Sequence, residues 1–185
     1  TKEIRDHLLI GAAGLELMAQ AIYDQRTEHI VLGFRDSLIH CYYAVEQTLS
    51  QRIMLKENSM LHEVSKSHDL CRLAEMATIV GVKKWKEFLK KINLHLAFCY
   101  PAKYYDINPE ALSLIGKLSN EPKAVKKDTI IKAVKLCFEM YAKSIVFITE
   151  VSCIKIENQP EILTVLQSLQ EQVTERVHIL PRTAA

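Results

Sequence analysis

The sequence has few residues of the types that interrupt or cross-link a chain. Its 185 residues include five glycines, five prolines and five cysteines. The cysteines are odd in number, widely spaced and never arranged as Cys-x-x-Cys, which argues against the disulfide framework of a small secreted domain. We therefore expect reduced, mostly buried thiols and an intracellular location, either cytoplasmic or nuclear.

Long apolar runs and a strong net charge are also missing. No run approaches the ~20 apolar residues of a membrane span, so no membrane association is expected. The formal net charge is only +2, which is too balanced for nucleic-acid binding by bulk electrostatics, and any such site must be a local patch. The chain starts at Thr1 without a methionine or a signal-peptide pattern, which suggests a fragment of a longer protein.

The sequence lacks the motifs that mark phosphate loops and common metal sites. It contains neither Gly-x4-Gly-Lys-Ser/Thr nor Gly-x-Gly-x-x-Gly, so a glycine-rich phosphate loop is not expected. A His-Glu-x-x-His pattern is missing too, and the seven histidines are scattered along the chain. We therefore expect no metal ion and no other cofactor.

Apolar residues recur at three- and four-residue steps along most of the chain, which indicates amphipathic helices. Helices are expected over residues 3–25, 28–57, 68–80, 83–98, 110–118, 123–155 and 161–178. The second carries an apolar stripe of Phe34, Leu38, Cys41, Val45, Leu49 and Ile53. Ser67 is the expected N-cap of the third. Because no strand pattern, hairpin turn or internal repeat is present, the sequence predicts an all-α protein, a single helical bundle of about five to seven helices.

Length and composition fit one folded core, since 49% of the residues are hydrophobic and 25% are charged. We assign residues 1–157 to the helical bundle. Residues 158–185 are assigned to an additional C-terminal helix and tail that pack on the bundle or leave it. Gly11 and Gly14 fall inside the first expected helix, where each costs ~1 kcal/mol relative to alanine unless a neighbouring helix packs closely there.

The stretch GFRDSLIHCYY, residues 33–43, contains the residue types that indicate chemistry. On a helix, Asp36 and His40 lie four residues apart on the polar side, so the carboxylate can accept the imidazole Nδ1–H and leave Nε2 for proton transfer. Arg35, at the border of that side, carries a planar charge that suits a phosphate. These residues predict RNA cleavage without metal, with His40 as general acid or base, Arg35 as phosphate ligand and Asp36 as orienting group. The plainer interpretation is a solvated helix face, and spacing alone favours it.

Further side chains are candidates for contact with a nucleotide or with RNA. They are Tyr43, Lys83, Lys84, Lys103, Tyr104 and Tyr105. Lysines around Trp85 suit a phosphate backbone while the indole stacks on a base, and tyrosines in the proline-bounded segment 99–109 suit nucleobases. The structural alternatives are an exposed lysine face with Trp85 packed inward, and aromatic rings that cover the end of the bundle.

The stretch GFRDSLIHCYY resembles the motif of ribonucleases in the HEPN superfamily (higher eukaryotes and prokaryotes nucleotide-binding domains), in which His follows Arg after four to six residues. Three more segments are similar to the family: CYYAVEQTLSQRIML (41–55), SKSHDLCRLAEMA (65–77) and CYPAKYYD (99–106). Together the four segments cover roughly residues 5–152. Many members carry the Arg-His motif after the His-x-Leu segment, whereas here it comes before. The resemblance implies a helical bundle that binds RNA or nucleotides, cleaves RNA in some members and is a non-catalytic partner in others.

Two functions stay open at this point. The first is a HEPN-like domain that binds RNA or nucleotide phosphates, and that cleaves RNA when two copies meet as a homodimer with Arg35, Asp36 and His40 facing a shared cleft. The second is a non-catalytic helical module that binds another protein. The sequence decides neither whether the chain is an enzyme nor what its partner is.

Overall fold

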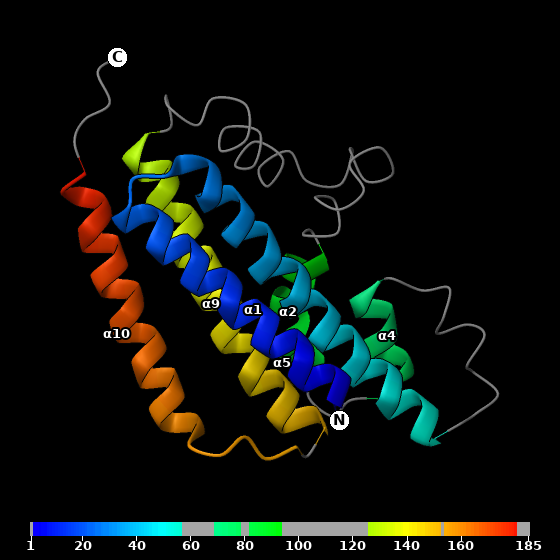
Figure 1. Cartoon of the computed structure of the whole chain (residues 1–185). Helices are drawn as coiled ribbons and strands as arrows, with labels where there is room; N and C mark the ends of the chain where they lie inside the picture. Colours follow the sequence, from blue (N-terminus) through cyan, green and yellow to red (C-terminus); the bar gives the residue numbers. More distant parts are fainter. Residues whose placement is uncertain (1, 57–68, 79–81, 94–125, 153, 181–185) are drawn as a thin grey trace.

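The computed structural model of the chain describes residues 2–56, 69–78, 82–93, 126–152 and 154–180 (Figure 1). Within these ranges it holds six α-helices and no strand, which confirms the predicted all-α bundle. The helices are α1 (Lys2–Tyr23), α2 (Thr27–Lys56), α4 (Leu70–Met76), α5 (Val82–Asn93), α9 (Lys127–Ser152) and α10 (Gln159–His178). The helix predicted at 110–118 lies outside the described residues. None of the helices in the described ranges is long and apolar enough to cross a membrane.

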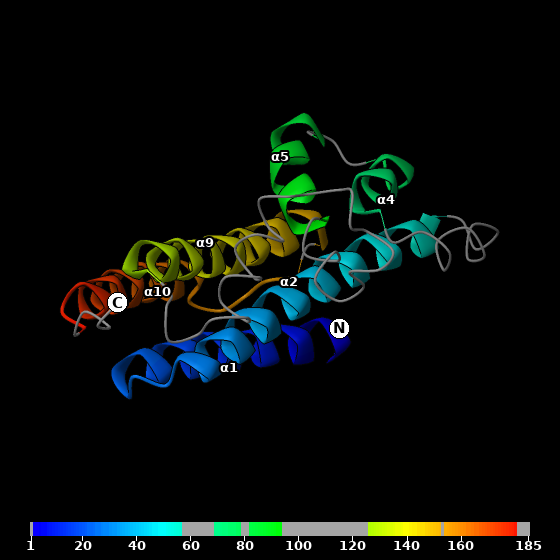
Figure 2. The same cartoon turned by 90° about the horizontal axis from the view of Figure 1, so that it is seen from above.

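Helices α1 and α2 form an antiparallel hairpin and lie side by side in both views (Figures 1 and 2). Their backbones approach closely where two glycines face each other. A β-carbon added to Gly14 would lie 2.6 Å from the Ser37 backbone nitrogen, and one added to Gly33 would lie 2.5 Å from the Gly14 carbonyl oxygen. Both distances are too short for any side chain. The condition under which Gly14 would not weaken its helix, close packing of a neighbouring helix, is therefore met.

The core lies between this hairpin and α9. The apolar stripe predicted for α2 is buried along its whole length, from Phe34 to Ile53. Helix α9 packs against α2 and α10 and contributes Phe138 and Phe147 to the same core. Cys41 is fully buried there, and burial raises the pKa of its thiol to about 12. This thiol stays protonated and acts as a small apolar group, as predicted.

The short helix α4 begins at Leu70, and its N-cap is Asp69. The Asp69 carboxylate accepts hydrogen bonds from the backbone N–H groups of Cys71 and Arg72, at 2.9 and 3.4 Å. The Asn93 side chain, at the end of α5, donates a third hydrogen bond to it at 2.9 Å. The prediction of Ser67 as the N-cap is wrong, because the helix starts later and a carboxylate beside its first turn satisfies the free N–H groups.

Helix α10 begins at Gln159, two residues before the predicted start, with Pro160 in its first turn. Proline is tolerated there because the first N–H groups of a helix have no partner within the helix. At the other end of α10, Lys127 Nζ donates a hydrogen bond to the His178 carbonyl oxygen at 2.7 Å. A cation at this position interacts favourably with the helix dipole.

We expect Gly14→Ala to lower the free energy of unfolding by ~1–2 kcal/mol, because overpacking at the α1–α2 contact outweighs the better helix propensity of alanine. Urea denaturation followed by circular dichroism measures this. Gly11→Ala is the matched control, since a β-carbon there would lie 3.2 Å from a side-chain ring atom of Tyr141 and 3.6 Å from the nearest backbone atom, the Ser37 carbonyl oxygen. A Gly14→Ala protein at least as stable as the wild type would contradict the backbone contact.

Candidate functional site

The conspicuous polar feature of the hairpin is a pair of histidines that joins α1 to α2. His40 Nδ1 lies 2.9 Å from His7 Nδ1, and both side chains are half-buried. Tyr43, also half-buried, packs near both rings, with centroid distances of 5.3 Å to His7 and 6.0 Å to His40. We call these three residues the histidine cluster.

The short contact between the Nδ1 atoms of His7 and His40 constrains both imidazoles. A neutral imidazole has one N–H donor and one acceptor nitrogen. When the two Nδ1 atoms share a hydrogen bond, one of them carries the hydrogen and the other accepts it. When both rings are neutral they therefore adopt opposite tautomers, and each ring fixes the orientation of the other.

The protonation of His40 follows from its surroundings. Burial lowers the pKa of His40 below the ordinary value of ~6.5, the nearby His7 lowers it further, and Asp36 acts in the opposite direction. His40 is therefore neutral at neutral pH. A neutral imidazole is the form that a general base requires.

The residues predicted from the Arg-x4-His motif lie as follows. Asp36 is exposed, and Arg35 is half-buried on the same helix. The His40 nitrogen for which Asp36 was the expected acceptor faces His7 of α1 instead, and Asp36 acts on His40 through its charge. The structure thus brings His40 and Tyr43 together, with His7 as the neighbour that orients the ring. The catalytic roles of Arg35, Asp36 and His40 stay predictions.

The predicted ligand contacts on α5 are arranged as an exposed helix face. Lys83 and Lys84 are exposed, and Lys84 Nζ lies 3.1 Å from a carboxylate oxygen of Glu150 on α9. Trp85 is only 7% exposed and packs against the ring of Phe147. The structural interpretation of Trp85 is therefore confirmed, because a buried indole is not presented to a nucleobase.

Three other predicted contacts, Lys103, Tyr104 and Tyr105, lie outside the described residues. Among the residues that are described, no group of three or more His, Cys, Asp or Glu side chains is placed to hold a metal ion.

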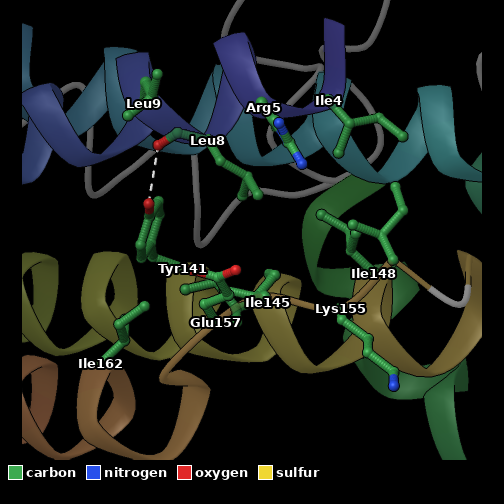
Figure 3. Close-up of a pocket in the computed structure, with 12 residues that line it drawn as sticks. Ile4, Arg5, Leu8, Leu9, Tyr141, Ile145, Ile148, Lys155, Glu157 and Ile162 are labelled. Atoms are coloured by element: carbon green, nitrogen blue, oxygen red, sulfur yellow. Dashed lines mark hydrogen bonds between the residues drawn. The ribbon is translucent and has the colours of Figure 1, made fainter. Parts of the chain in front are cut away.

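An apolar groove of about 500 Å³ lies between α1, α9 and the start of α10 (Figure 3). It is lined by Ile4, Leu8, Leu9, Tyr141, Ile145, Ile148, Ile154, Ile156 and Ile162, with Arg5, Lys155 and Glu157 as its charged residues. The Tyr141 hydroxyl donates a hydrogen bond to the Leu8 carbonyl oxygen at 2.8 Å and so connects two walls. We call this feature the α1–α10 groove.

The groove exists because the first half of α10 covers the core less completely than the second half. Val173 and Val177, in the second half of α10, are fully buried, whereas Ile162 and Leu166 are only half-buried and Val165 is 64% exposed. In Figure 1, α1 and α10 are close at their C-terminal ends and apart at their N-terminal ends. Apolar side chains in the first half of α10 are therefore left accessible to a partner.

The depressed pKa of His40 predicts a pH dependence of stability. Its folded-state pKa lies below the unfolded value of ~6.5, so the unfolded chain binds more protons and the free energy of unfolding decreases as the pH falls through this value. We expect wild type to lose more stability than His40→Asn between about pH 7.5 and about pH 5.5. Urea denaturation at a series of pH values measures the difference, and His178→Asn, at an exposed position of α10, should behave as wild type. If the free energies of unfolding of wild type and His40→Asn changed in parallel with pH, the lowered pKa assigned to His40 would be contradicted.

Two features escaped the sequence analysis, namely His7 and the α1–α10 groove. The register of the hairpin would have revealed His7, because His7 precedes Gly14 by seven residues and His40 follows Gly33 by seven. Seven residues make about two helical turns, so each histidine lies on the face of its helix that carries the glycine. In an antiparallel pair of helices the two histidines therefore meet. No local sequence pattern indicates the groove, since the groove depends on how α10 is oriented relative to α1.

Comparisons of the chain with protein-family models, with curated proteins and with solved structures found no match.

Proposed function

We propose that the chain is a helical assembly module that pairs with a second copy of itself across the α1–α10 groove. The observation that supports this is the groove itself, which is lined by isoleucine and leucine side chains from three helices and a linking segment. Leu9, which lines the groove on α1, is 67% exposed, and Val165 on α10 is 64% exposed. A concave surface lined by apolar side chains can gain free energy when a partner covers it, because apolar area is then removed from water.

The charges of the groove favour a second copy as the occupant. A two-fold interface must be complementary to itself, since the same surface is used on both sides. Arg5 lies on α1 and points into the groove, whereas Glu157 comes from the segment between α9 and α10 (Figure 3). A two-fold arrangement can therefore set Arg5 of each copy against Glu157 of the other. The net charge of +2 causes little repulsion between copies.

The first test changes the apolar wall. Leu9→Glu should weaken self-association at least tenfold, because pairing would bury a carboxylate among isoleucines without a partner. The fold should be unaffected, since Leu9 is largely exposed in a single chain. Sedimentation equilibrium over a range of concentrations measures the dissociation constant. Leu32→Glu, which introduces the same charge at a 51% exposed leucine of α2 outside the groove, is the control.

A charge exchange sharpens this test. Arg5→Glu should weaken pairing roughly 2- to 30-fold, because each of two exposed ion pairs contributes ~0.2–1 kcal/mol. The double variant Arg5→Glu/Glu157→Arg should restore it. A wild type that stays monomeric at all concentrations, or equal effects of Leu9→Glu and Leu32→Glu, would exclude self-pairing through the groove.

A second candidate function is cleavage of RNA without metal. The observation that favours it is a neutral, half-buried His40 held in a fixed orientation by a second imidazole. RNA carries its own nucleophile, the 2′-hydroxyl, next to the phosphate that is cleaved. A base that removes its proton and a cation that stabilises the developing charge are the protein groups needed. His40 and Arg35 have these properties, and the resemblance to HEPN ribonucleases implies the same roles.

Cleavage is tested by incubating end-labelled RNA with the protein in EDTA. The products should carry 2′,3′-cyclic phosphate and 5′-hydroxyl ends, and Arg35→Ala and His40→Ala should each lower the rate by ~10²- to 10⁴-fold. Arg72→Ala and His178→Ala remove the same side-chain types from exposed positions of α4 and α10 and should leave the rate unchanged. Equal rates in wild type and both site variants would show that any cleavage comes from a contaminant.

A further inference from the structure

Positive charge dominates the outer side of α5. Lysine occupies five of the six positions on this helix that the structure describes as exposed. These positions are Lys83, Lys84, Lys86, Glu87, Lys90 and Lys91. The apolar side chains Trp85, Phe88, Leu89 and Ile92 are buried against the bundle. The described part of α5 therefore offers charge to a partner and no exposed apolar side chain.

Helix α9 extends this positive surface. Lys132, Lys135 and Lys143 are exposed there. Each lies four or seven residues from Glu139, so all three share its side of the helix. The ammonium groups of Lys91, on α5, and Lys143 lie 3.6 and 2.7 Å from the same Glu139 oxygen, which joins the two surfaces. We call the five exposed lysines of α5 together with Lys132, Lys135 and Lys143 the lysine face.

The positive charge of the lysine face exceeds the charge of its carboxylates. The carboxylates on the same sides of α5 and α9 are Glu87, Asp128, Glu139 and Glu150. Against eight lysines they leave four positive charges, although the whole chain has a net charge of only +2. The hydrogen bond from Lys143 and the charges of Lys143 and Lys91 hold the pKa of the Glu139 carboxyl below its ordinary value. The face is therefore a local positive patch on a nearly balanced chain.

Four lysines of the face belong to none of the ion pairs between described residues. They are Lys83, Lys86, Lys132 and Lys135. The surplus of charge decreases toward α4, where the carboxylates of Asp69 and Glu75 act on the same thiol, Cys71, as Lys86 and Lys90 do. Exposed like charges that lack a counter-ion attract an anionic partner, and their summed field speeds its approach.

The lack of exposed apolar side chains separates the classes of anionic partner. None of the large hydrophobic side chains that the structure describes as exposed lies on α5 or α9. A helix that lies on a membrane inserts apolar side chains below the headgroups. A single-stranded nucleic acid gains affinity from bases that stack on aromatic rings. A double helix keeps its bases stacked inside and its phosphates outside, so a face of lysines alone suits it best.

We propose that the lysine face binds the phosphate backbone of a double-stranded nucleic acid without reading its sequence. From Lys132 to Glu150 the face extends ~27 Å along α9, and a duplex presents one phosphate charge per ~1.7 Å of its axis, so several phosphates are within reach. Figure 2 shows α5 and α1 on opposite sides of α2. The lysine face is therefore separate from the histidine cluster, and the inference goes beyond both proposed functions and requires neither.

Fluorescence anisotropy with labelled duplexes of ~20 base pairs tests the proposal, since at ~3.4 Å per base pair they are longer than the face. The logarithm of the binding constant should fall linearly with the logarithm of the salt concentration, with a slope of about −3 to −4 for four neutralised phosphates. Duplexes of different sequence should bind alike. An RNA and a DNA duplex form the two arms, and tighter binding of either one identifies the source of the backbone and supports the proposal.

The variants Lys83→Glu/Lys86→Glu and Lys132→Glu/Lys135→Glu change lysines outside the ion pairs. Each should weaken binding of the duplex ~10-fold or more and reduce the steepness of the salt dependence by about 2. The control Lys2→Glu/Arg26→Glu changes the net charge equally at exposed positions next to the two ends of α1. It should change the dissociation constant less than about 2-fold, because charges farther than a Debye length are screened. Circular dichroism should show the same helix content in all variants, since the substituted side chains are exposed.

Four results would overturn the proposal. They are a wild type that binds neither duplex at low salt, equal weakening in the face variants and the control, tighter binding of a single strand of the same length, and binding of phosphatidylserine-containing vesicles without binding of either duplex. The third would indicate contacts to unstacked bases, and the fourth would assign the face to a membrane surface.

Discussion

At the crossing of α1 and α2 two helix backbones touch with no side chain between them, and the rest of the bundle depends on this contact. Gly14 and Gly33 are the residues that allow it. The contact also fixes the register of the hairpin, so that positions equally far from the two glycines meet. His7 and His40, each seven residues away, face each other for this reason. A packing constraint in the sequence thus determines which imidazoles are neighbours.

Helix α1 serves two surfaces because adjacent residues of a helix point about 100° apart. His7 faces α2, whereas Ile4 and Leu8 line the α1–α10 groove. The groove and the histidine cluster therefore lie on different sides of one helix. A substitution in one of them can be made without direct contact with the other.

Most of the fold could be predicted from the sequence, because its signals are local. The stripe from Phe34 to Ile53 repeats at helical spacing, and all of it is buried. Helix ends were less predictable: Asp69 caps α4 in place of Ser67, and α10 begins before Pro160. The position of a helix end depends on which nearby capping residue or proline fits against the neighbouring helices.

The site was only partly predictable, because its contacts join residues far apart in the chain. His40 was identified from its own helix, but its partner His7 is 33 residues away. Lys84 was selected for its charge, and the structure pairs it with Glu150 of α9, 66 residues later. Spacing within one helix identifies the side chains that share a face. It does not identify the side chains of a neighbouring helix that contact them.

The bond from Lys127 to the last turn of α10 has a mechanical consequence. Together with Val173 and Val177, it anchors the C-terminal end of α10 to the start of α9. The opposite end of α10 packs on the core through half-buried side chains, Ile162 and Leu166 among them. Less apolar surface is removed from water there, so the start of α10 is held more weakly than its end. Local opening of the start of α10 therefore costs less free energy than opening of its end.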